Sequence, residues 1–164
     1  GFTISALNLL NKFVKLEKLN VEIKVILGTF FSYSEEIKKL KSSLDISFTE
    51  YRDVSNMHDF IAEADLGLIS YGTTAYEFAV MRTQCFYFCL TEDHAMSAEE
   101  FQKNLFGKSF KYNDILNIDK LLPVFVDYIN ILNSKDIEFN KSFKQISGKG
   151  AENIAKVIDQ KVKI

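Results

Sequence analysis

The stretch that decides the fold is residues 64–77, which read ADLGLISYGTTAYE. Residues 65–70 form a short apolar run, typical of a strand that is covered on both faces. A turn containing Gly72 follows, and an apolar helical pattern extends from Ala75 to Met81. The stretch therefore predicts a buried strand that leads directly into a helix.

The same alternation continues on both sides of this stretch. The patterns predict helices at 5–18, 34–42, 55–64, 75–81, 94–105, 119–133 and 150–162, and strands at 21–27, 46–49, 65–70, 85–90 and 109–112. Strands separated by single helices indicate βαβ units and a mostly parallel sheet. We therefore predict a doubly wound α/β fold, Rossmann-like, with helices on both faces, as a single domain over residues 1–164.

Three local details of the helices can also be predicted. Ser34 is the expected N-cap of the second helix. The only proline, Pro123, is expected in the first turn of the 119–133 helix, where it is tolerated. The amphipathic helix at 150–162 is expected to turn one apolar side inward, formed by Ile154, Val157, Ile158 and Val162.

Composition restricts the class of protein. Hydrophobic residues make up 47% of the chain and include 15 Phe, which excludes disorder as the main state. Lys and Arg number 20 against 22 Asp and Glu, so no positive excess points to nucleic acid or an acidic membrane. No run of 18 uncharged apolar residues predicts a membrane span. Cys85 and Cys89 are predicted to be buried thiols of a cytoplasmic protein.

Ligands of doubly wound folds bind beyond the carboxyl ends of the strands, so the loops after Leu27, Ile69 and Leu90 matter most. After Ile69, the turn 72–74 (Gly72, Thr73 and Thr74) places backbone N–H groups and two hydroxyls at a helix N-terminus, which can hold a phosphate. Glu77, one turn further, could accept hydrogen bonds from two ribose hydroxyls. In the alternative interpretation, Thr73 or Thr74 caps the helix and Glu77 completes a capping box.

Two further strand ends carry candidate residues. Asp93 and His94 follow Leu90, and His94 could act as an acid or base or donate to a ligand; alternatively, Thr91 or Asp93 simply caps a solvated helix. Val54 and Met57 could pack on a flat base, or form a hydrophobic staple at a helix start. Neither a nucleophile–base set nor a metal-ligand cluster can be assembled, so the sequence predicts no metal and no cofactor.

The order of these segments resembles the C-terminal half of GT-B fold proteins. The segments are VSNM (54–57), ADLGLIS (64–70), GTTAYE (72–77) and DH (93–94), together with VILG (25–28) and GKGAENI (148–154). They are similar to the UDP-sugar hydrolase of pseudaminic acid biosynthesis and to the spore coat polysaccharide biosynthesis proteins. The peptidoglycan N-acetylglucosaminyltransferase is a more distant likeness.

The resemblance implies a site for UDP or a UDP-sugar. Glu77 would bind the ribose hydroxyls, and Gly72, Thr73 and Thr74 would face the diphosphate. Backbone around Val54 and Met57 would hold the uracil. Asp93 and His94 would contact the sugar or a phosphate. Tyr71, where relatives carry a small residue, is expected to crowd the phosphate loop.

The function implied by the resemblance is the nucleotide-binding half of a UDP-sugar hydrolase in surface polysaccharide or nonulosonic acid biosynthesis. Its catalytic residues would lie in an N-terminal half of the same protein, so the chain alone is expected to be inactive. One alternative is a UDP-sugar-dependent glycosyltransferase of the same fold, and another is a non-catalytic nucleotide-sugar-binding domain. The sugar, the acceptor and the oligomeric state are left open by the sequence.

Overall fold

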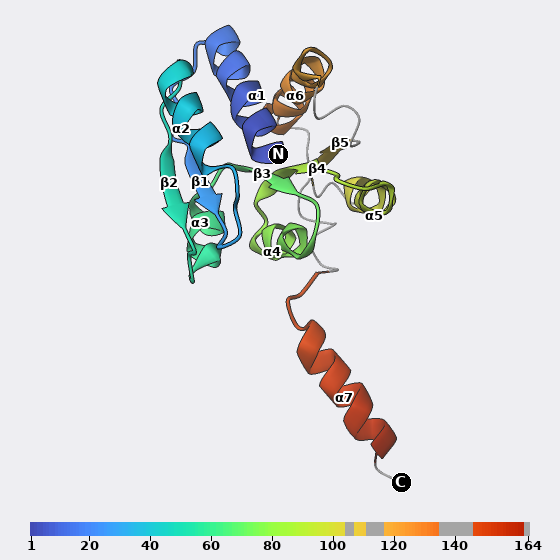
Figure 1. Cartoon of the computed structure of the whole chain (residues 1–164). Helices are drawn as coiled ribbons and strands as arrows, with labels where there is room; N and C mark the ends of the chain where they lie inside the picture. Colours follow the sequence, from blue (N-terminus) through green and yellow to red (C-terminus); the bar gives the residue numbers. More distant parts are fainter. Residues whose placement is uncertain (104–106, 111–116, 135–145, 163–164) are drawn as a thin grey trace.

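The computed structural model of the chain describes residues 1–103, 107–110, 117–134 and 146–162. Helices and strands alternate as predicted (Figure 1). The helices are α1 (Phe2–Glu17), α2 (Ser34–Ser43), α3 (Met57–Glu63), α4 (Thr73–Met81), α5 (Glu92–Lys103), α6 (Ile118–Asn133) and α7 (Gly150–Val162). The strands are β1 (Lys24–Leu27), β2 (Thr49–Arg52), β3 (Leu66–Ser70), β4 (Gln84–Phe88) and β5 (Lys108–Phe110).

The strands form two parallel sheets. One contains β1 and β2, and the other has the order β3-β4-β5. In the larger sheet Leu66 pairs with Gln84, and Phe86 pairs with Lys108. Figure 1 shows α1, α2 and α6 on one side of the strands and α3 and α4 on the other. The predicted Rossmann-like α/β fold, with helices on both faces, is therefore confirmed.

The core is centred on β4, whose five residues are all buried. On one face, Phe86 and Phe88 join apolar side chains of α1 and α6, including Phe13 and Phe125. On the other face, Tyr87 lies in a cluster with side chains of α3, α4 and α5. A third cluster covers β1 with residues of α1 and α2. Parallel strands with both faces covered are apolar throughout, and this apolar run is the signal that predicts β4 from the sequence.

Some predicted boundaries are wrong. No strand forms at 46–48, and β2 begins at Thr49 instead, because Ile46 and Phe48 are buried from a connecting segment. Tyr33, not Ser34, is the N-cap of α2 and makes no side-chain capping bond. Pro123 is the sixth residue of α6 and lies beyond its first turn, so the predicted place of this proline in the first turn is wrong. The predicted ends at 104–105 and 111–112 lie outside the described residues.

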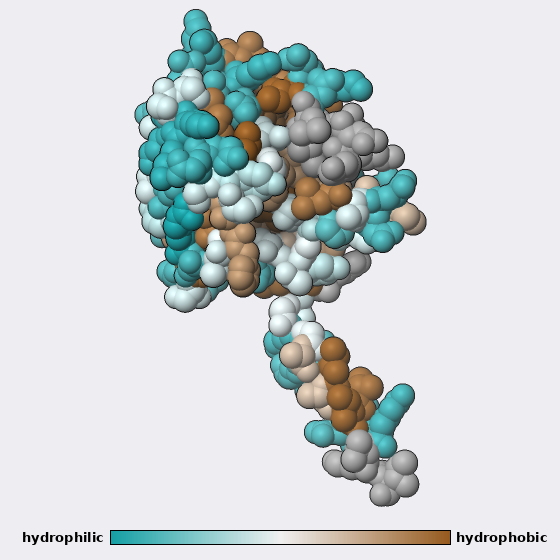
Figure 2. Space-filling view, viewed as in Figure 1, coloured by the Kyte–Doolittle hydropathy of each residue, from teal (hydrophilic) through white to brown (hydrophobic). Residues whose placement is uncertain are grey.

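The prediction for the C-terminal helix is wrong in its packing. Figure 1 shows α7 extending away from the α/β body, and Figure 2 shows an apolar stripe along one side of it. Ile154, Val157 and Ile158 of that stripe are 63%, 52% and 55% exposed. The helix predicted from the amphipathic pattern is confirmed. Periodicity alone, however, does not say which surface the apolar side of a helix meets. The burial of Val162 lies outside the described part.

Candidate functional site

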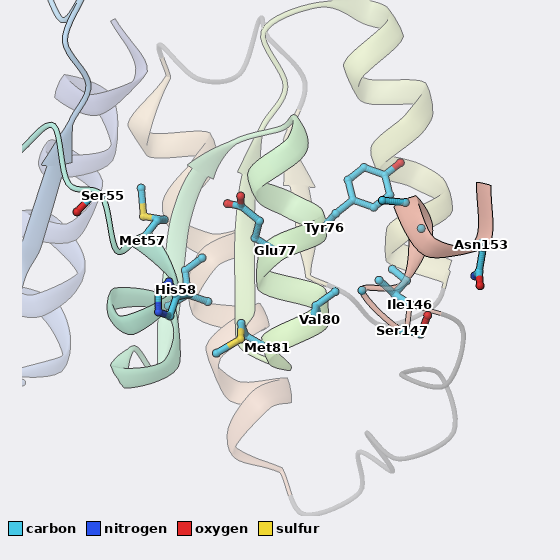
Figure 3. A pocket seen from close by; sticks show the side chains of 14 residues that line it. Ser55, Met57, His58, Tyr76, Glu77, Val80, Met81, Ile146, Ser147 and Asn153 are labelled. Atoms are coloured by element: carbon cyan, nitrogen blue, oxygen red, sulfur yellow. The ribbon is translucent and has the colours of Figure 1, made fainter. Parts of the chain in front are cut away.

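A pocket of about 830 Å³ lies between α3, α4 and the segment that leads into α7 (Figure 3). Backbone and side chains of three regions line it: 55–61, 76–81 and 146–153. Its lining residues are Ser55, Met57, His58, Ile61, Tyr76, Glu77, Val80, Met81, Ile146, Ser147, Gly148, Gly150, Ala151 and Asn153. The pocket combines an apolar floor with a few polar side chains, which is the usual make-up of a small-molecule site.

Two of the predicted site residues meet in this pocket. Met57 and Glu77 come from different helices and both line it. Figure 3 shows the Glu77 carboxylate directed toward the N-terminal end of α4, on the side that faces Met57. Thr73 precedes Glu77 by four residues, so the two share one face of the helix. The structure thus places the Glu77 carboxylate one turn from the N-terminus of α4, but Gly72, Thr73 and Thr74 do not line the pocket.

The N-terminus of α4 begins directly after β3 and has no side-chain cap. Gly72 occupies the N-cap position, and the amide of Ala75 donates to its carbonyl oxygen at 3.0 Å. Thr73 and Thr74 are the first two helical residues, so the alternative prediction that either of them caps α4 is wrong. A β-carbon built on Gly72 would meet no atom within 4 Å. The turn is therefore open to a ligand on the side where a helix carries partial positive charge.

Tyr71 does not crowd this turn, contrary to expectation, because its side chain is buried in the core. Its ring packs edge-on against Tyr87 and Phe101, with centroids 5.5 and 5.6 Å apart. Burial, reinforced by the neighbouring Tyr76 hydroxyl, raises the pKa of Tyr71 to about 12. Its hydroxyl therefore stays protonated at neutral pH and links the core to Tyr76 at the rim of the pocket.

Asp93 and His94 lie in the first turn of α5 and do not line the pocket. The amide of His94 donates to the Thr91 hydroxyl oxygen at 3.2 Å, so Thr91 caps the helix and the capping interpretation of this loop is confirmed for Thr91. The His94 ring lies 6.0 Å from that of Tyr71. Its Nδ1 atom is buried, and no described residue forms a hydrogen bond with it.

Val54 also lies outside the pocket. Hydrogen bonds of the preceding residue, Asp53, hold the loop in place. The Thr29 hydroxyl donates to Asp53 Oδ1 at 2.6 Å, and the Asp53 amide donates to the Leu27 carbonyl oxygen at 3.1 Å. Asp53 adopts a left-handed backbone, with φ of 49°. These bonds hold together the loops that follow β1 and β2, at the carboxyl edge of both strands.

Sequence reasoning missed two walls of the pocket. Tyr76 is half-exposed and packs edge-on against Phe101, with centroids 4.7 Å apart; its position beside Glu77 could have indicated it. The segment Ile146–Gly150 forms the other wall, and Ile146 packs against the core cluster of α4 and β4. Residues 146–150 are distant from α4 in the sequence, so only the three-dimensional structure shows that they lie beside it.

The electrostatics of the pocket are modest. No Lys or Arg lines it within the described ranges, and its one carboxylate is Glu77. His58 pairs with Asp59 at 3.2 Å on the exposed side of α3. Across the part of the chain that the structure describes, no three His, Cys, Asp or Glu side chains gather as a metal site would require. Attraction for a phosphate would therefore come from the α4 N-terminus.

The two cysteines are not candidate nucleophiles. Both are fully buried, as predicted. Burial raises the pKa of Cys85 to about 12 and that of Cys89 to about 11, so both remain thiols at neutral pH. A buried thiol with a raised pKa is inert, since the thiolate is the reactive form.

Comparison with known proteins does not identify a family for this chain. No protein-family model and no curated protein matches it. None of the helices within the described ranges is long and apolar enough to cross a membrane. Fold and site together define the class as a Rossmann-like α/β domain with a pocket between α3, α4 and the segment that leads into α7.

Proposed function

We propose that this domain binds the UDP portion of a nucleotide sugar in the pocket beside α4. The observation that carries the proposal is the meeting of Met57 and Glu77 in one pocket, one helical turn below the open N-terminus of α4. The likeness in segment order to UDP-sugar hydrolases supports the same ligand. Ligands of doubly wound folds bind at this edge of the sheet.

Each part of the nucleotide has a chemically suitable partner. The carboxylate of Glu77 accepts hydrogen bonds from the two ribose hydroxyls. The amides and hydroxyls of Thr73 and Thr74 donate to the diphosphate, aided by the helix dipole. Backbone around Val54 and the side chain of Met57 contact the base. Asp93 and His94, in the first turn of α5 and outside the pocket lining, are the proposed contacts to the sugar or a phosphate.

The proposed role is that of a nucleotide-binding half in a UDP-sugar hydrolase. The pocket supplies binding and leaving-group stabilisation, because hydrogen-bond donors at a helix N-terminus stabilise negative charge that develops on a departing phosphate. The group that activates water would come from another part of the protein. We therefore expect the 164-residue chain to bind UDP weakly and to release no sugar from a UDP-sugar.

A calorimetric titration with UDP, CMP and ADP tests the proposal. We expect binding of UDP in preference to the other two nucleotides, and loss of that binding in Glu77→Ala. Asp127→Ala is the matched control, because it removes an exposed carboxylate from α6, whose side chains pack on the opposite face of the sheet. Equal UDP affinity in Glu77→Ala and the wild type would contradict the proposed ribose contact.

A further inference from the structure

The apolar side of α7 lies in solvent. Ile154, Val157 and Ile158 recur at the spacing of one helical face and are 63%, 52% and 55% exposed. Figure 2 shows the apolar stripe that runs along this projecting helix. Isolated helices shorter than about 12–15 residues are marginal in water, so a projecting helix of 13 residues gains most of its stability from the surface that covers its apolar side.

The exposed apolar surface continues from α7 onto α4. Tyr76, Val80 and Met81 of α4 are 50%, 40% and 38% exposed. Ala151 precedes Ile154 by three residues and so lies on the apolar side of α7. It lines the same pocket as the three α4 residues. The apolar side of α7 therefore begins beside the exposed apolar side chains of α4.

These two parts together form what we call the α4–α7 surface. Its large apolar side chains are Tyr76, Val80, Met81, Ile154, Val157 and Ile158. Each exposes on the order of 100 Å², so that together they approach the 800 Å² or so that each partner buries in a stable protein–protein interface. An apolar patch of this size on one chain marks an interaction surface.

The charges of α7 favour a second copy of this chain as the partner. Residues 150–162 carry two acids, Glu152 and Asp159, and two bases, Lys156 and Lys161, so the helix has no net charge. Helices that lie in a membrane interface are rich in Lys and Arg on their polar face, and nucleic acid also requires an excess of positive charge. A helix without net charge can approach its own copy without electrostatic repulsion.

The position of Lys161 determines the direction in which two copies of α7 can pair. Lys161 follows Val157 by four residues and Ile158 by three, so it lies on the apolar side. Parallel pairing would place two Lys161 ammonium groups side by side in the contact. Antiparallel pairing about the level of residue 156 separates them by about 15 Å and brings each near the first turn of the other helix, which carries Glu152. The helix dipoles also oppose each other in this arrangement.

We propose that the α4–α7 surface is the interface of a homodimer in which the α7 helices of two copies pack antiparallel. The contact is isologous, with the twofold axis at the level of residue 156. Ile154 of each copy lies opposite Ile158 of the other. A helix of 13 residues is about 20 Å long, so the C-terminal end of each α7 reaches Tyr76 and Val80 of the other copy.

The dimer contact and the proposed nucleotide contacts lie on different sides of α4. Figure 3 shows Tyr76 and Asn153 on one side of this helix and Met57 on the other. The Glu77 carboxylate lies on the side that faces Met57. Pairing through α7 therefore leaves the Met57 side of the pocket open, and the dimer does not depend on nucleotide binding.

Sedimentation equilibrium of the 164-residue chain at a series of concentrations tests the proposal. We expect a reversible monomer–dimer equilibrium in the wild type. Ile158→Glu should raise the dimer Kd at least about tenfold, because it places a carboxylate in the apolar contact. Gln160→Glu is the matched control, since it adds the same charge to the polar side of the same helix, and should keep the Kd within about twofold. A wild type that stays monomeric at every concentration, or equal Kd values for the two variants, would overturn the proposal.

Disulfide cross-linking tests the direction of the helices. The chain has two cysteines, Cys85 and Cys89, and both are buried, so thiols introduced on α7 can be followed without background. Ala151→Cys and Lys161→Cys chains are mixed and oxidised, and the products are identified by mass. Antiparallel pairing predicts that the mixed disulfide between the two variants exceeds either homodisulfide, because only positions 151 and 161 lie opposite each other. A predominance of homodisulfides would show parallel pairing and overturn the proposed interface.

Discussion

The two parallel sheets of this chain differ sharply in how they are embedded. Every residue of β4 is buried, whereas Thr49 and Arg52 of β2 are exposed. β4 is paired on both edges and covered by aromatic side chains, but β2 is paired with β1 alone among the described strands. The comparison shows that pairing on both edges and cover on both faces, rather than strand length, concentrates the stability of the domain around β4.

The strand β3 shows the effect of an unpaired edge within the larger sheet. Its sequence, LGLIS, is nearly as apolar as that of β4, yet only Gly67 is fully buried. Leu66, Leu68 and Ile69 are partly buried in clusters on either face. The exposure of β3 therefore arises from its position at the edge of its sheet and not from its composition.

The largest expected difference between the sheets comes from removing an aromatic ring from each. Phe86 is fully buried and packs against Phe110 and Phe125, with centroids 4.1 and 4.7 Å apart. We expect Phe86→Ala to lower the free energy of unfolding by about 3–5 kcal/mol. Tyr51→Ala, in β2, should cost about 1–2 kcal/mol. Urea denaturation measures the free energy of unfolding of both variants. Equal losses of free energy would contradict the conclusion that stability is concentrated around β4.

A matched pair of glycines gives the next largest effect. A β-carbon on Gly67 of β3 would lie 2.2 Å from the ring of Phe78, whereas one on Gly28, just after β1, would meet nothing within 4 Å. We expect Gly67→Ala to cost about 1–3 kcal/mol because α4 must shift. Gly28→Ala should change stability by less than about 0.5 kcal/mol. Similar thermal midpoints for the two variants would argue against close packing of α4 on β3.

Alkaline pH should weaken the larger sheet through its thiols. Burial raises the folded-state pKa of Cys85 to about 12, from 9.0 in the unfolded chain. Between these values the unfolded state releases a proton that the folded state keeps, so the free energy of unfolding falls as pH rises. The expected slope is about 1.4 kcal/mol per pH unit for this group. Denaturation curves from pH 8 to 10.5 measure it, and Cys85→Ala should reduce the total slope by about half, because the buried Cys89 keeps its own raised pKa.

The smallest expected effect concerns a single buried hydrogen bond at the start of β4. The Tyr128 hydroxyl of α6 donates to Gln84 Oε1 at 2.8 Å. We expect Tyr128→Phe to cost about 1 kcal/mol, because the buried amide loses its partner. Tyr51→Phe in β2 is the control and should leave chemical denaturation unchanged. A loss at Tyr51 as large as that at Tyr128 would show that the two sheets bury their polar groups alike.

Much of the fold could be predicted from local pattern. The buried strand at 65–70 and the helix that follows were found because apolar runs and a Gly-Thr-Thr turn are local signals. The position of β2 was not found, since Ile46 and Phe48 are apolar for reasons of tertiary burial. The predicted inward packing of the apolar side of α7 is also wrong, because an amphipathic pattern does not identify the surface that this side meets.

The candidate site could be predicted only in part. Glu77 and the N-terminus of α4 are adjacent in sequence, and the fold brings Met57 and Glu77 to one pocket, whose lining does not include residues 72–74. Asp93 and His94 do not line the pocket: the His94 ring lies beside that of Tyr71, and Asp93 is exposed on the first turn of α5.

The most direct test of the nucleotide site is amide NMR mapping with UDP on the uniformly ¹⁵N-labelled chain. The account predicts saturable shifts concentrated at Met57, at Gly72–Thr74 and at Glu77, with none of comparable size in β2 or the outer part of α7. Glu77→Ala should abolish them, while Asp127→Ala should preserve them. Saturable shifts confined to other surfaces, or shifts that persist in Glu77→Ala, would contradict the placement of the nucleotide beside α4.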